Sequence, residues 1–417
     1  MQYNGNRPRV AITGLGAITP VGNSIAEMWD NLTNGRSGIA RITHFDPSPY
    51  QTQFAGEVRN FDVNQYMDRR EARRSDRYVH YVFGAAHQAV EDAGLDFSRE
   101  NPERVGVIIG TATGGLEILL ENYDRLREHG PRKVSPFFLA AMTVDAAGAQ
   151  LAINYGLTGP SYAPVSACAS GVNALGEAAE LIRRGDADVV IAGGSEAGVI
   201  PAAFAGFNVM QALSTRNDSP ETACRPFDIT RDGFVIGEGC GVAILESEEH
   251  ARARGARIYA ELAGYGTSVD GYHMAVPSEE GRGAQQTMRL ALQDARISPE
   301  EVDYINAHGT GTELNDLRET QAIKGVFGEH AYDMAVSSTK SMTGHMLGAA
   351  GAMEAIVCTK TIETGVIAPT INLHNPDPEC DLDYVPHEAR EAQVNIAATN
   401  SFGLGGHNGC LVVRRWR

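Results

Sequence analysis

Short runs of β-branched and other aliphatic residues alternate with stretches of helical hydrophobic spacing along the chain. Several apolar runs lead into loops rich in glycine and threonine. This alternation is typical of an α/β protein, in which helices connect the strands of a central sheet. Strands are predicted over residues 10–13, 104–109, 188–192, 241–246, 257–264, 302–307, 334–337 and 395–401.

Helices are predicted between these strands. Ser24 and Glu27 have the spacing of a capping box, and Gly35 suits the left-handed conformation that ends a helix, so a helix lies between them. A short charged helix begins at residues 247–250. Further helices are predicted over residues 75–93, 115–129, 169–184, 284–295, 313–327 and 347–364.

Two segments of the chain resemble each other. Residues 104–113 and 302–312 each form a strand pattern that runs into a loop of glycine and threonine. A chain of 417 residues also exceeds the usual size of one small domain. We therefore predict two related halves, residues 1–250 and 251–417.

The composition, with 43% hydrophobic and 21% charged residues, is that of a soluble globular protein. No apolar run approaches the roughly 18 residues that span a bilayer, and residues 1–7 have no apolar segment behind their positive charge. We therefore expect a cytoplasmic protein with no membrane span. The net charge of -17 argues against general affinity for nucleic acid. Six scattered cysteines without C-x-x-C spacing indicate reduced thiols and no metal site.

One segment departs from the acidic composition. Five arginines fall within residues 69–77, and at helical spacing Arg70, Arg73, Arg74 and Arg77 share one face. Such a face could attract an acidic partner over a distance. Composition alone favours a solvated face paired with the acidic residues between the arginines.

Cys168 has the surroundings of a reactive thiol. It lies among small residues between a strand-like run and a predicted helix. The free N–H groups at a helix N-terminus favour a thiolate, and small neighbours leave the sulfur approachable. The helix dipole contributes only about 0.3 to 1 kcal/mol, so a further activating partner is expected. For any single cysteine a buried, inert thiol is the common alternative, and the other five cysteines receive that interpretation.

Two histidines are candidates for that partner. His308 follows a predicted strand and opens the sequence His-Gly-Thr-Gly-Thr, and His345 precedes a Gly/Ala-rich helix. Catalytic groups of α/β proteins are usually found where strands pass into loops. Either histidine alone would be an ordinary polar residue. Together with Cys168, they predict a site for nucleophilic catalysis.

These motifs resemble the β-ketoacyl-acyl carrier protein synthases of the thiolase superfamily, most closely the elongating type II enzymes. The resemblance extends nearly end to end, through residues 10–16, 338–345 and 400–406. His345 is similar to the second histidine of the decarboxylating Cys-His-His branch. The resemblance implies a thiolase-like α/β fold, with two related halves forming a layered α-β-α-β-α core. It also implies elongation of fatty acids by two carbons, through decarboxylative Claisen condensation of malonyl-acyl carrier protein with an acyl chain on Cys168.

The resemblance implies a role for each catalytic residue. Cys168 would carry the acyl chain, and the backbone N–H groups of Cys168 and Phe402 would form an oxyanion hole. Phe402 would also gate the site. Neutral His308 and His345 would each donate a hydrogen bond to the malonyl thioester carbonyl. Lys340 would keep His345 unprotonated.

Further positions follow from the same resemblance. Thr310 and Thr312 would contact the pantetheine amides of the substrate. Glu354 would either form a buried salt bridge with Lys340 or hold a structural monovalent cation. The enzyme itself would need no cofactor, because the phosphopantetheine of acyl carrier protein carries both substrates.

The implied partners are acyl carrier protein and a second copy of the chain in a homodimer, without nucleic acid or membrane. Because acyl carrier proteins are strongly acidic, a basic surface would attract them. The positions that match the docking surface of the family are Arg70, Arg73, Arg74, Arg132 and Lys133.

Three positions depart from the family pattern. Gln211 replaces an arginine that contacts the carrier, and Asp145 replaces an asparagine near the pocket and the dimer interface. Thr113 replaces an isoleucine of the acyl pocket, so the preferred chain length stays open.

Other classes of protein would differ at the catalytic positions. A thiolase would need a second cysteine in place of His345, and a non-catalytic partner subunit would lack Cys168. A ketosynthase of a specialised polyketide or polyunsaturated fatty acid pathway would share the catalytic residues and stays an alternative.

Overall fold

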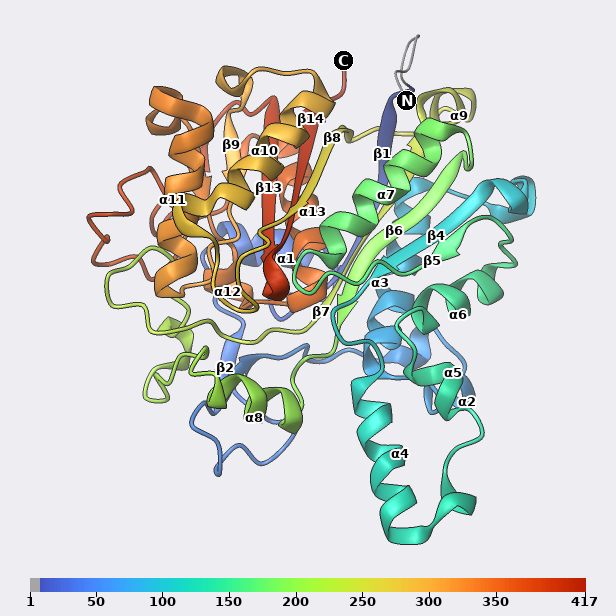
Figure 1. The fold of residues 1–417 in the computed structure, drawn as a ribbon. Helices are drawn as coiled ribbons and strands as arrows, with labels where there is room; N and C mark the ends of the chain where they lie inside the picture. Colours follow the sequence, from blue (N-terminus) through green and yellow to red (C-terminus); the bar gives the residue numbers. More distant parts are fainter. Residues whose placement is uncertain (1–7) are drawn as a thin grey trace.

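The computed structural model describes residues 8–417, and residues 1–7, which bear on the predicted absence of a secretory signal, lie outside the described part (Figure 1). Within residues 8–417, ten strands form one mixed sheet, in the order β10-β9-β13-β14-β8-β1-β7-β6-β4-β5. The strands of this sheet are β1 (Val10–Ile18), β4 (Val105–Gly110), β5 (Ser161–Tyr162), β6 (Val189–Glu196), β7 (Gly239–Ser247), β8 (Ala260–Val269), β9 (Tyr304–Asn306), β10 (Ala335–Ser337), β13 (Ile396–Gly403) and β14 (His407–Arg415). Two small ribbons pair β2 (Ile39–Arg41) with β3 (Phe54–Gly56), and β11 (Val366–Ile367) with β12 (Arg390–Glu391). All eight predicted strands are confirmed, and β5 and β14 are the two additions to this sheet.

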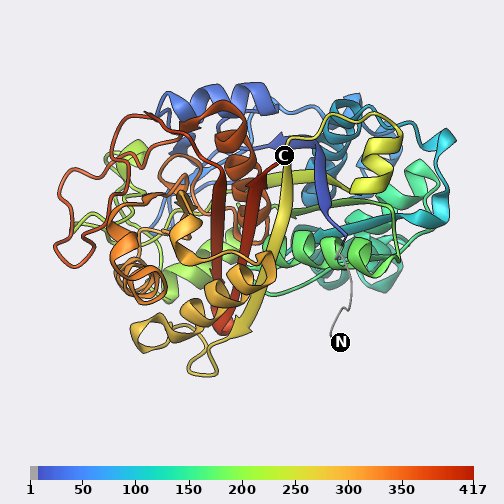
Figure 2. The ribbon, with the colours of Figure 1, turned by 90° about the horizontal axis from the view of Figure 1, so that it is seen from above.

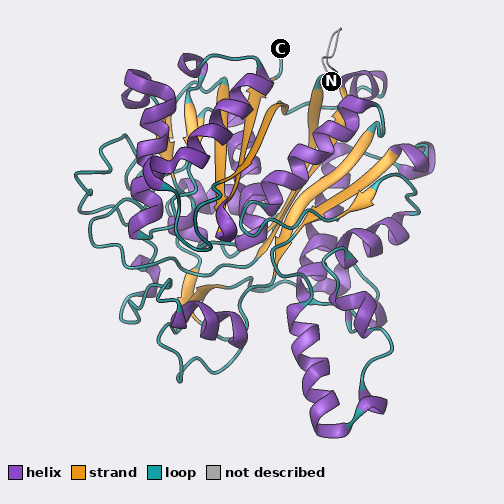
Figure 3. Cartoon of the chain, viewed as in Figure 1, coloured by secondary structure: helices purple, strands orange, loops and turns teal. Residues whose placement is uncertain are grey.

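Helices cover both faces of the sheet (Figure 3). They are α1 (Ile25–Thr33), α2 (Arg69–Ala72), α3 (Arg77–Ala93), α4 (Leu116–His129), α5 (Phe138–Met142), α6 (Ala146–Tyr155), α7 (Ser170–Arg184), α8 (Pro201–Val209), α9 (Glu248–Ala253), α10 (Arg282–Ala295), α11 (Glu313–Phe327), α12 (Lys340–Thr343) and α13 (Ala350–Thr364). The predicted helices are present within a few residues. In the part of the chain that the structure describes, no helix is long and apolar enough to cross a membrane.

The sheet consists of two halves with one repeated topology. The order β5-β4-β6-β7-β1 in one half matches β10-β9-β13-β14-β8 in the other. In each half the first three strands run parallel to one another, and the fourth strand is antiparallel to both of its neighbours. The halves join where β1 pairs with β8. We propose, on this repetition, that the chain divides into two related halves near residue 250, between β7 and β8.

The helices α7 and α13 lie between the two halves of the sheet and contact strands of both. With α3 on one outer face and α10 on the other, they complete the predicted α-β-α-β-α layers (Figure 2). Glycines allow α7 and α13 to pack closely. A Cβ at Gly171 would lie 2.8 Å from Ala352 N, and one at Gly351 only 2.4 Å from Val172 Cγ2. This close packing fixes the chain segments that precede the two helices, which carry Cys168 and His345.

A part-buried ion cluster joins β7 to α9. Glu246, on β7, accepts hydrogen bonds from Thr13, Arg254 and His250 Nδ1, the last at 2.6 Å. Glu100 lies 2.9 Å from His250 Nε2. The hydrogen bond with Glu246 is the main cause that raises the pKa of His250 from 6.5 to about 9. The imidazolium is therefore the form that the folded protein prefers.

This cluster predicts a pH-dependent stability. The stabilisation is fully present below pH 6.5, the ordinary pKa, and is lost as pH rises through about 9, because the folded state then gives up the extra proton. We expect the free energy of unfolding in urea to fall over this range and the fall to be smaller in His250→Gln. An unchanged slope in the variant would contradict the role of His250.

Candidate active site

Cys168 lies in a sharp turn two residues before α7 and is 8% exposed. Ala167 has a φ of 51°, in the left-handed region that non-glycine residues seldom adopt. Ser170 holds this turn, because its hydroxyl donates to Ala167 O at 2.6 Å and accepts from Ser166 N at 2.9 Å. The backbone is therefore constrained around the sulfur.

At Cys168, burial has a larger effect on the pKa of the thiol than the helix N-terminus. It raises the pKa of the thiol to about 12, although the Lys340 charge and a backbone N–H group act in the opposite direction. The expected effect of the helix end, which favours a thiolate, is therefore outweighed by burial, and the thiol is the favoured form at neutral pH. The predicted histidine partner is in place, since His345 Nε2 lies 3.0 Å from Cys168 Sγ.

His308 and His345 face each other beside the sulfur. Their ring centroids are 5.1 Å apart and their planes are nearly perpendicular. Burial first, and then the charge of Lys340, lowers the pKa of both imidazoles well below the ordinary value. The Nδ1 atoms of both rings are buried without a hydrogen-bond partner in the described structure. An imidazolium would leave a buried N–H unpaired at each Nδ1, so the geometry also favours neutral rings.

Glu319 supports His308 from behind and is absent from the sequence-based prediction. Its carboxylate accepts the backbone N–H groups of His308 at 2.8 Å and Gly309 at 2.7 Å, and also the side chain of Asn400. Burial raises the pKa of Glu319 to about 7. The only indication in the sequence is one acidic residue within a helix, which does not reveal whether that residue faces the core.

Lys340 and Glu354 form an ion pair, and both side chains are fully buried. The first of the two interpretations of Glu354, a buried salt bridge, is therefore present. Burial raises the pKa of Glu354. Its second oxygen, Oε2, has no hydrogen-bond partner among the described residues.

A cavity of about 490 Å³ opens onto Cys168, His308 and His345. Its other lining groups include Thr310, Thr312, Phe402, Gln211 and Arg231, together with apolar side chains from α8 and the loop before β7. The hydroxyls of the two threonines lie 3.0 Å apart. This channel therefore joins the thiol to a pair of hydroxyl groups.

The C-terminal end of β13 lies against the backbone of Cys168. Ser401 Oγ donates to Cys168 O at 2.9 Å. A Cβ at Gly403 would lie 2.9 Å from Cys168 N, so only glycine fits there. The backbone of the Phe402 segment is thus held against the nucleophile.

Thr113 is not among the residues that line this cavity. Its hydroxyl donates to the buried carboxylate of Glu196 at 2.5 Å. Glu196 also accepts the backbone N–H groups of Ala112 and Gly348, at 2.7 and 3.1 Å. Asp145, the other departure near the pocket, is exposed at the start of α6.

The predicted arginine face is wrong as a single helix face. The helix α2 ends at Ala72, and Asp76 caps a new helix, α3, which begins at Arg77. Arg77 turns inward and bonds to Glu117 at 2.7 Å and Glu238 at 3.3 Å, so it is not a surface charge. A capping aspartate inside the arginine run explains the break.

The remaining basic residues lie together at the surface. Arg70, Arg73, Arg132 and Lys133 are exposed. Arg74 stacks on the ring of Phe137 at 4.0 Å, which brings α2 beside the segment that follows Lys133. The two basic segments therefore adjoin.

The fold is that of the thiolase-like ketosynthases. The chain matches, with a TM-score of 0.92 and 37% identity, a structure titled as a type II PKS acyl-carrier protein in complex with its ketosynthase bound to the hexaketide, covering 99% of this chain and 100% of that chain. It matches a beta-ketoacyl synthase from Burkholderia phymatum with a TM-score of 0.91 and 36% identity, over 98% of this chain and 100% of that one.

The chain belongs to the beta-ketoacyl synthase family, whose N-terminal domain model matches residues 7–251 and whose C-terminal domain model matches residues 259–374. A Staphylococcus aureus protein named 3-oxoacyl-[acyl-carrier-protein] synthase 2 is 50% identical over 408 residues, 98% of each chain. A Synechocystis protein of the same name is 49% identical over 414 residues, 99% of this chain and 100% of the relative.

The buried thiol predicts slow alkylation at neutral pH. Only the thiolate reacts with iodoacetamide, so the rate constant at Cys168 should rise about tenfold for each pH unit between about pH 7 and 10. Peptide mapping by mass spectrometry separates Cys168 from the other thiols, and free cysteine, which levels off above its pKa of about 8.5, is the control. A plateau at Cys168 that begins near neutrality would reveal a preformed thiolate instead.

Proposed function

We propose that this protein elongates fatty acids by two carbons, condensing an acyl chain held on Cys168 with malonyl-acyl carrier protein. The observation that carries the proposal is the 3.0 Å approach of His345 Nε2 to Cys168 Sγ, with His308 facing both in one cavity. Relatives at about half identity over the full chain are named for the same reaction, which supports the substrate class.

The first step transfers the acyl chain to the enzyme. Cys168 Sγ attacks the thioester carbonyl of the acyl carrier, the bond to the pantetheine sulfur breaks, and the proton of the thiol passes to that departing sulfur. The backbone N–H groups of Cys168 and Phe402 stabilise the tetrahedral oxyanion. The hydrogen bond from Ser401 to Cys168 O supports this role, because it fixes the two segments to each other. His345 stays neutral throughout this step.

The second step removes carbon dioxide from the malonyl group. In the tautomer that carries a proton on Nε2, His308 and His345 each donate to the thioester carbonyl and stabilise the enolate. Neutral rings suit this step, because an imidazolium would also hold back the leaving carboxylate. The enolate carbon then attacks the acyl carbonyl, the bond to Cys168 Sγ breaks, and the released sulfur takes up a proton from solvent to restore the thiol. The 3-oxoacyl chain leaves on its carrier.

The pantetheine arm follows the channel. The paired hydroxyls of Thr310 and Thr312, which line the same cavity as the thiol, bind its amides. Arg70, Arg73, Arg74, Arg132 and Lys133 attract the acidic carrier, while Gln211 at the channel offers no charge. The family resemblance alone assigns Thr113 to the acyl pocket, because Thr113 does not line the cavity and its hydroxyl donates to Glu196.

We assign the chain to a homodimer in the cytoplasm. The strand β5 forms one edge of the sheet. Tyr162 and Val165 at this edge are 40% and 49% exposed, and Ile153 on the adjoining α6 is 80% exposed. Such exposed apolar side chains beside an open strand edge support pairing with a second copy.

We also propose that a structural monovalent cation binds at Glu354. Oε2 of Glu354, Oδ1 of Asn306 and Oγ1 of Thr399 are all buried without partners in the described structure. Asn306 and Thr399 are register partners in β9 and β13, on which α13 packs. Oxygen donors of this kind suit a hard cation, so the residues fit. The cation would offset buried oxygens and would take no part in a chemical step.

A ketosynthase of a specialised polyketide or polyunsaturated pathway is the second candidate. The similarity to the polyketide ketosynthase favours it, as does Thr113 in place of the isoleucine of the acyl pocket. The residues of both chemical steps would be the same. Incubation with acyl carriers of increasing length, followed by the mass of the intact chain, distinguishes the two by the chain that is accepted.

Two variants separate the proposed steps. Cys168→Ala should form no acyl-enzyme but retain some decarboxylation of malonyl carrier, because both imidazoles remain. His345→Ala should lose decarboxylation and condensation, by about 100-fold or more, as expected for one lost oxyanion donor. Radiolabelled carbon dioxide release and intact mass are the measurements, and Cys240→Ala is the buried-thiol control. An acyl adduct on another cysteine would falsify the assignment.

Charge reversal tests the docking surface. We expect the double variant with Arg73→Glu and Arg74→Glu to bind the carrier more weakly and to lose part of the salt dependence of binding, because exposed charges act through screened attraction. Arg99→Glu, beyond the far end of α3, is the control for a charge reversal outside the docking surface. Surface plasmon resonance at several salt concentrations gives both quantities. Equal affinity and salt slope in the double variant and the wild type would refute the docking proposal.

A further inference from the structure

Arg231 is a buried cation beside the channel, and neither chemical step uses it. It lies in the loop before β7, and its side chain is 3% exposed. It lines the same cavity as Cys168, Thr310 and Thr312. A buried guanidinium at a substrate channel either binds the substrate or fixes the walls of the channel.

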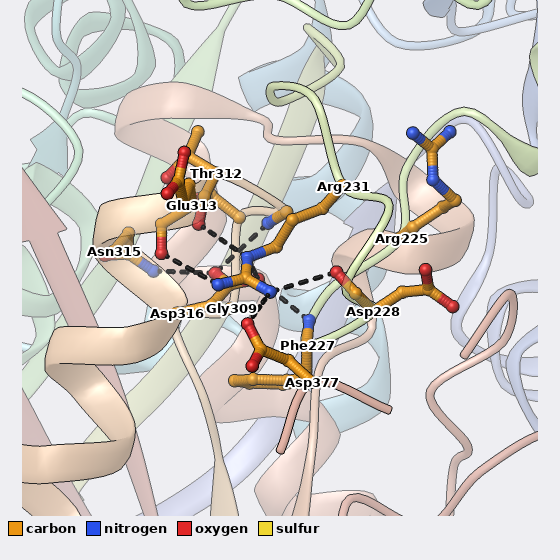
Figure 4. Close-up of polar contacts among 12 residues, drawn as sticks. Arg225, Phe227, Asp228, Arg231, Gly309, Thr312, Glu313, Asn315, Asp316 and Asp377 are labelled. Atoms are coloured by element: carbon orange, nitrogen blue, oxygen red, sulfur yellow. Dashed lines mark hydrogen bonds and ion pairs between the residues drawn. The ribbon is translucent and has the colours of Figure 1, made fainter. Parts of the chain in front are cut away.

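The hydrogen bonds of Arg231 favour the second role (Figure 4). Its Nε donates to Thr312 O at 3.3 Å, and one terminal nitrogen, Nη2, donates to Glu313 O at 3.0 Å. The other, Nη1, donates to Asp228 O at 2.9 Å and to Asp377 Oδ2 at 2.7 Å. Four of the five N–H groups are thus engaged with protein atoms, so the guanidinium is not presented to a substrate phosphate.

Asp316 connects Arg231 to a further part of the threonine loop, residues 310–312. Its Oδ2 lies 3.7 Å from the Arg231 guanidinium and accepts Phe227 N at 2.9 Å. Its Oδ1 accepts Gly311 N at 3.2 Å, and Gly311 O in turn accepts Gly233 N. Gly311, Thr312 and Glu313 therefore each have a backbone hydrogen bond to Asp316 or Arg231.

Burying the positive charge of Arg231 at this position costs free energy, so its presence indicates a role in holding the threonine loop. Arg231 lies at the N-terminal end of α11, where the helix dipole is positive and repels a cation. The carboxylates of Asp316 and Asp377 offset this repulsion. A neutral side chain of similar size could fill the same volume, but it could not hold two successive carbonyls and a carboxylate together.

We propose that Arg231 is a positioning residue that sets the Thr310–Thr312 hydroxyl pair for the pantetheine arm. It governs capture of carrier-bound substrates and leaves the chemistry at Cys168 unchanged. The inference rests on the proposed function, since it needs pantetheine in this channel. Arg225 is the contrasting neighbour, because it is equally buried but bonds to Asp232 and to carbonyls outside the threonine loop.

The test compares Arg231→Lys with the matched control Arg225→Lys. We expect KM for malonyl carrier to rise about tenfold in Arg231→Lys, the effect of losing a hydrogen bond from a charged group, with kcat within about twofold. Alkylation of Cys168 by iodoacetamide needs no pantetheine and should keep its rate. Arg225→Lys should leave KM unchanged. Asp377→Asn, which keeps the shape but weakens the grip, should raise KM in the same direction and serves if Arg231→Lys does not fold.

A double-mutant cycle isolates the route of the effect. If Arg231 acts through the hydroxyls, the substitution Arg231→Lys adds no further rise in KM to a chain that carries Thr310→Val and Thr312→Val. Additive effects, or a loss of kcat with constant KM, would overturn the inference. Failure of the wild type to form an acyl-enzyme on Cys168 would instead overturn the proposed function.

Discussion

Exclusion of water from His308 and His345 is the constraint on which the site depends. The two imidazoles are 2% and 3% exposed, and desolvation is the first cause of their lowered pKa values. The buried charge of Lys340 acts in the same direction, while Glu354 balances that charge. The same burial keeps Cys168 a thiol, so the site is inert until a thioester carbonyl arrives next to both the sulfur and the rings.

Each half of the sheet contributes part of the catalytic site. The first half supplies Cys168 ahead of α7, and the second supplies His308 after β9 and His345 ahead of α13. Because α7 and α13 pack through glycines between the halves, the three groups meet at one point of the fold. The C-terminal end of β13 completes the arrangement, because Ser401 donates a hydrogen bond to the backbone of Cys168.

Much of this architecture can be predicted from the sequence, because strand patterns, caps and small-residue turns are local. The strand β14 escapes prediction, since its apolar run is short and directly follows a glycine loop. Glu319 and Arg231 escape for another reason, because their partners lie tens of residues away in the chain. Arg77 shows the opposite error: regular spacing groups it with its neighbours, but Asp76 starts a new helix and turns it inward.

The neutrality of the two histidines can be measured directly. Nitrogen-15 chemical shifts of the imidazoles, assigned with His308→Asn and His345→Asn variants, report protonation as pH is lowered. The structure predicts that both rings stay neutral as pH is lowered from about 8 through the ordinary pKa of about 6.5. A ring that becomes protonated near pH 6.5 would contradict the account, because a charged imidazole could not serve as the neutral donor of the decarboxylation.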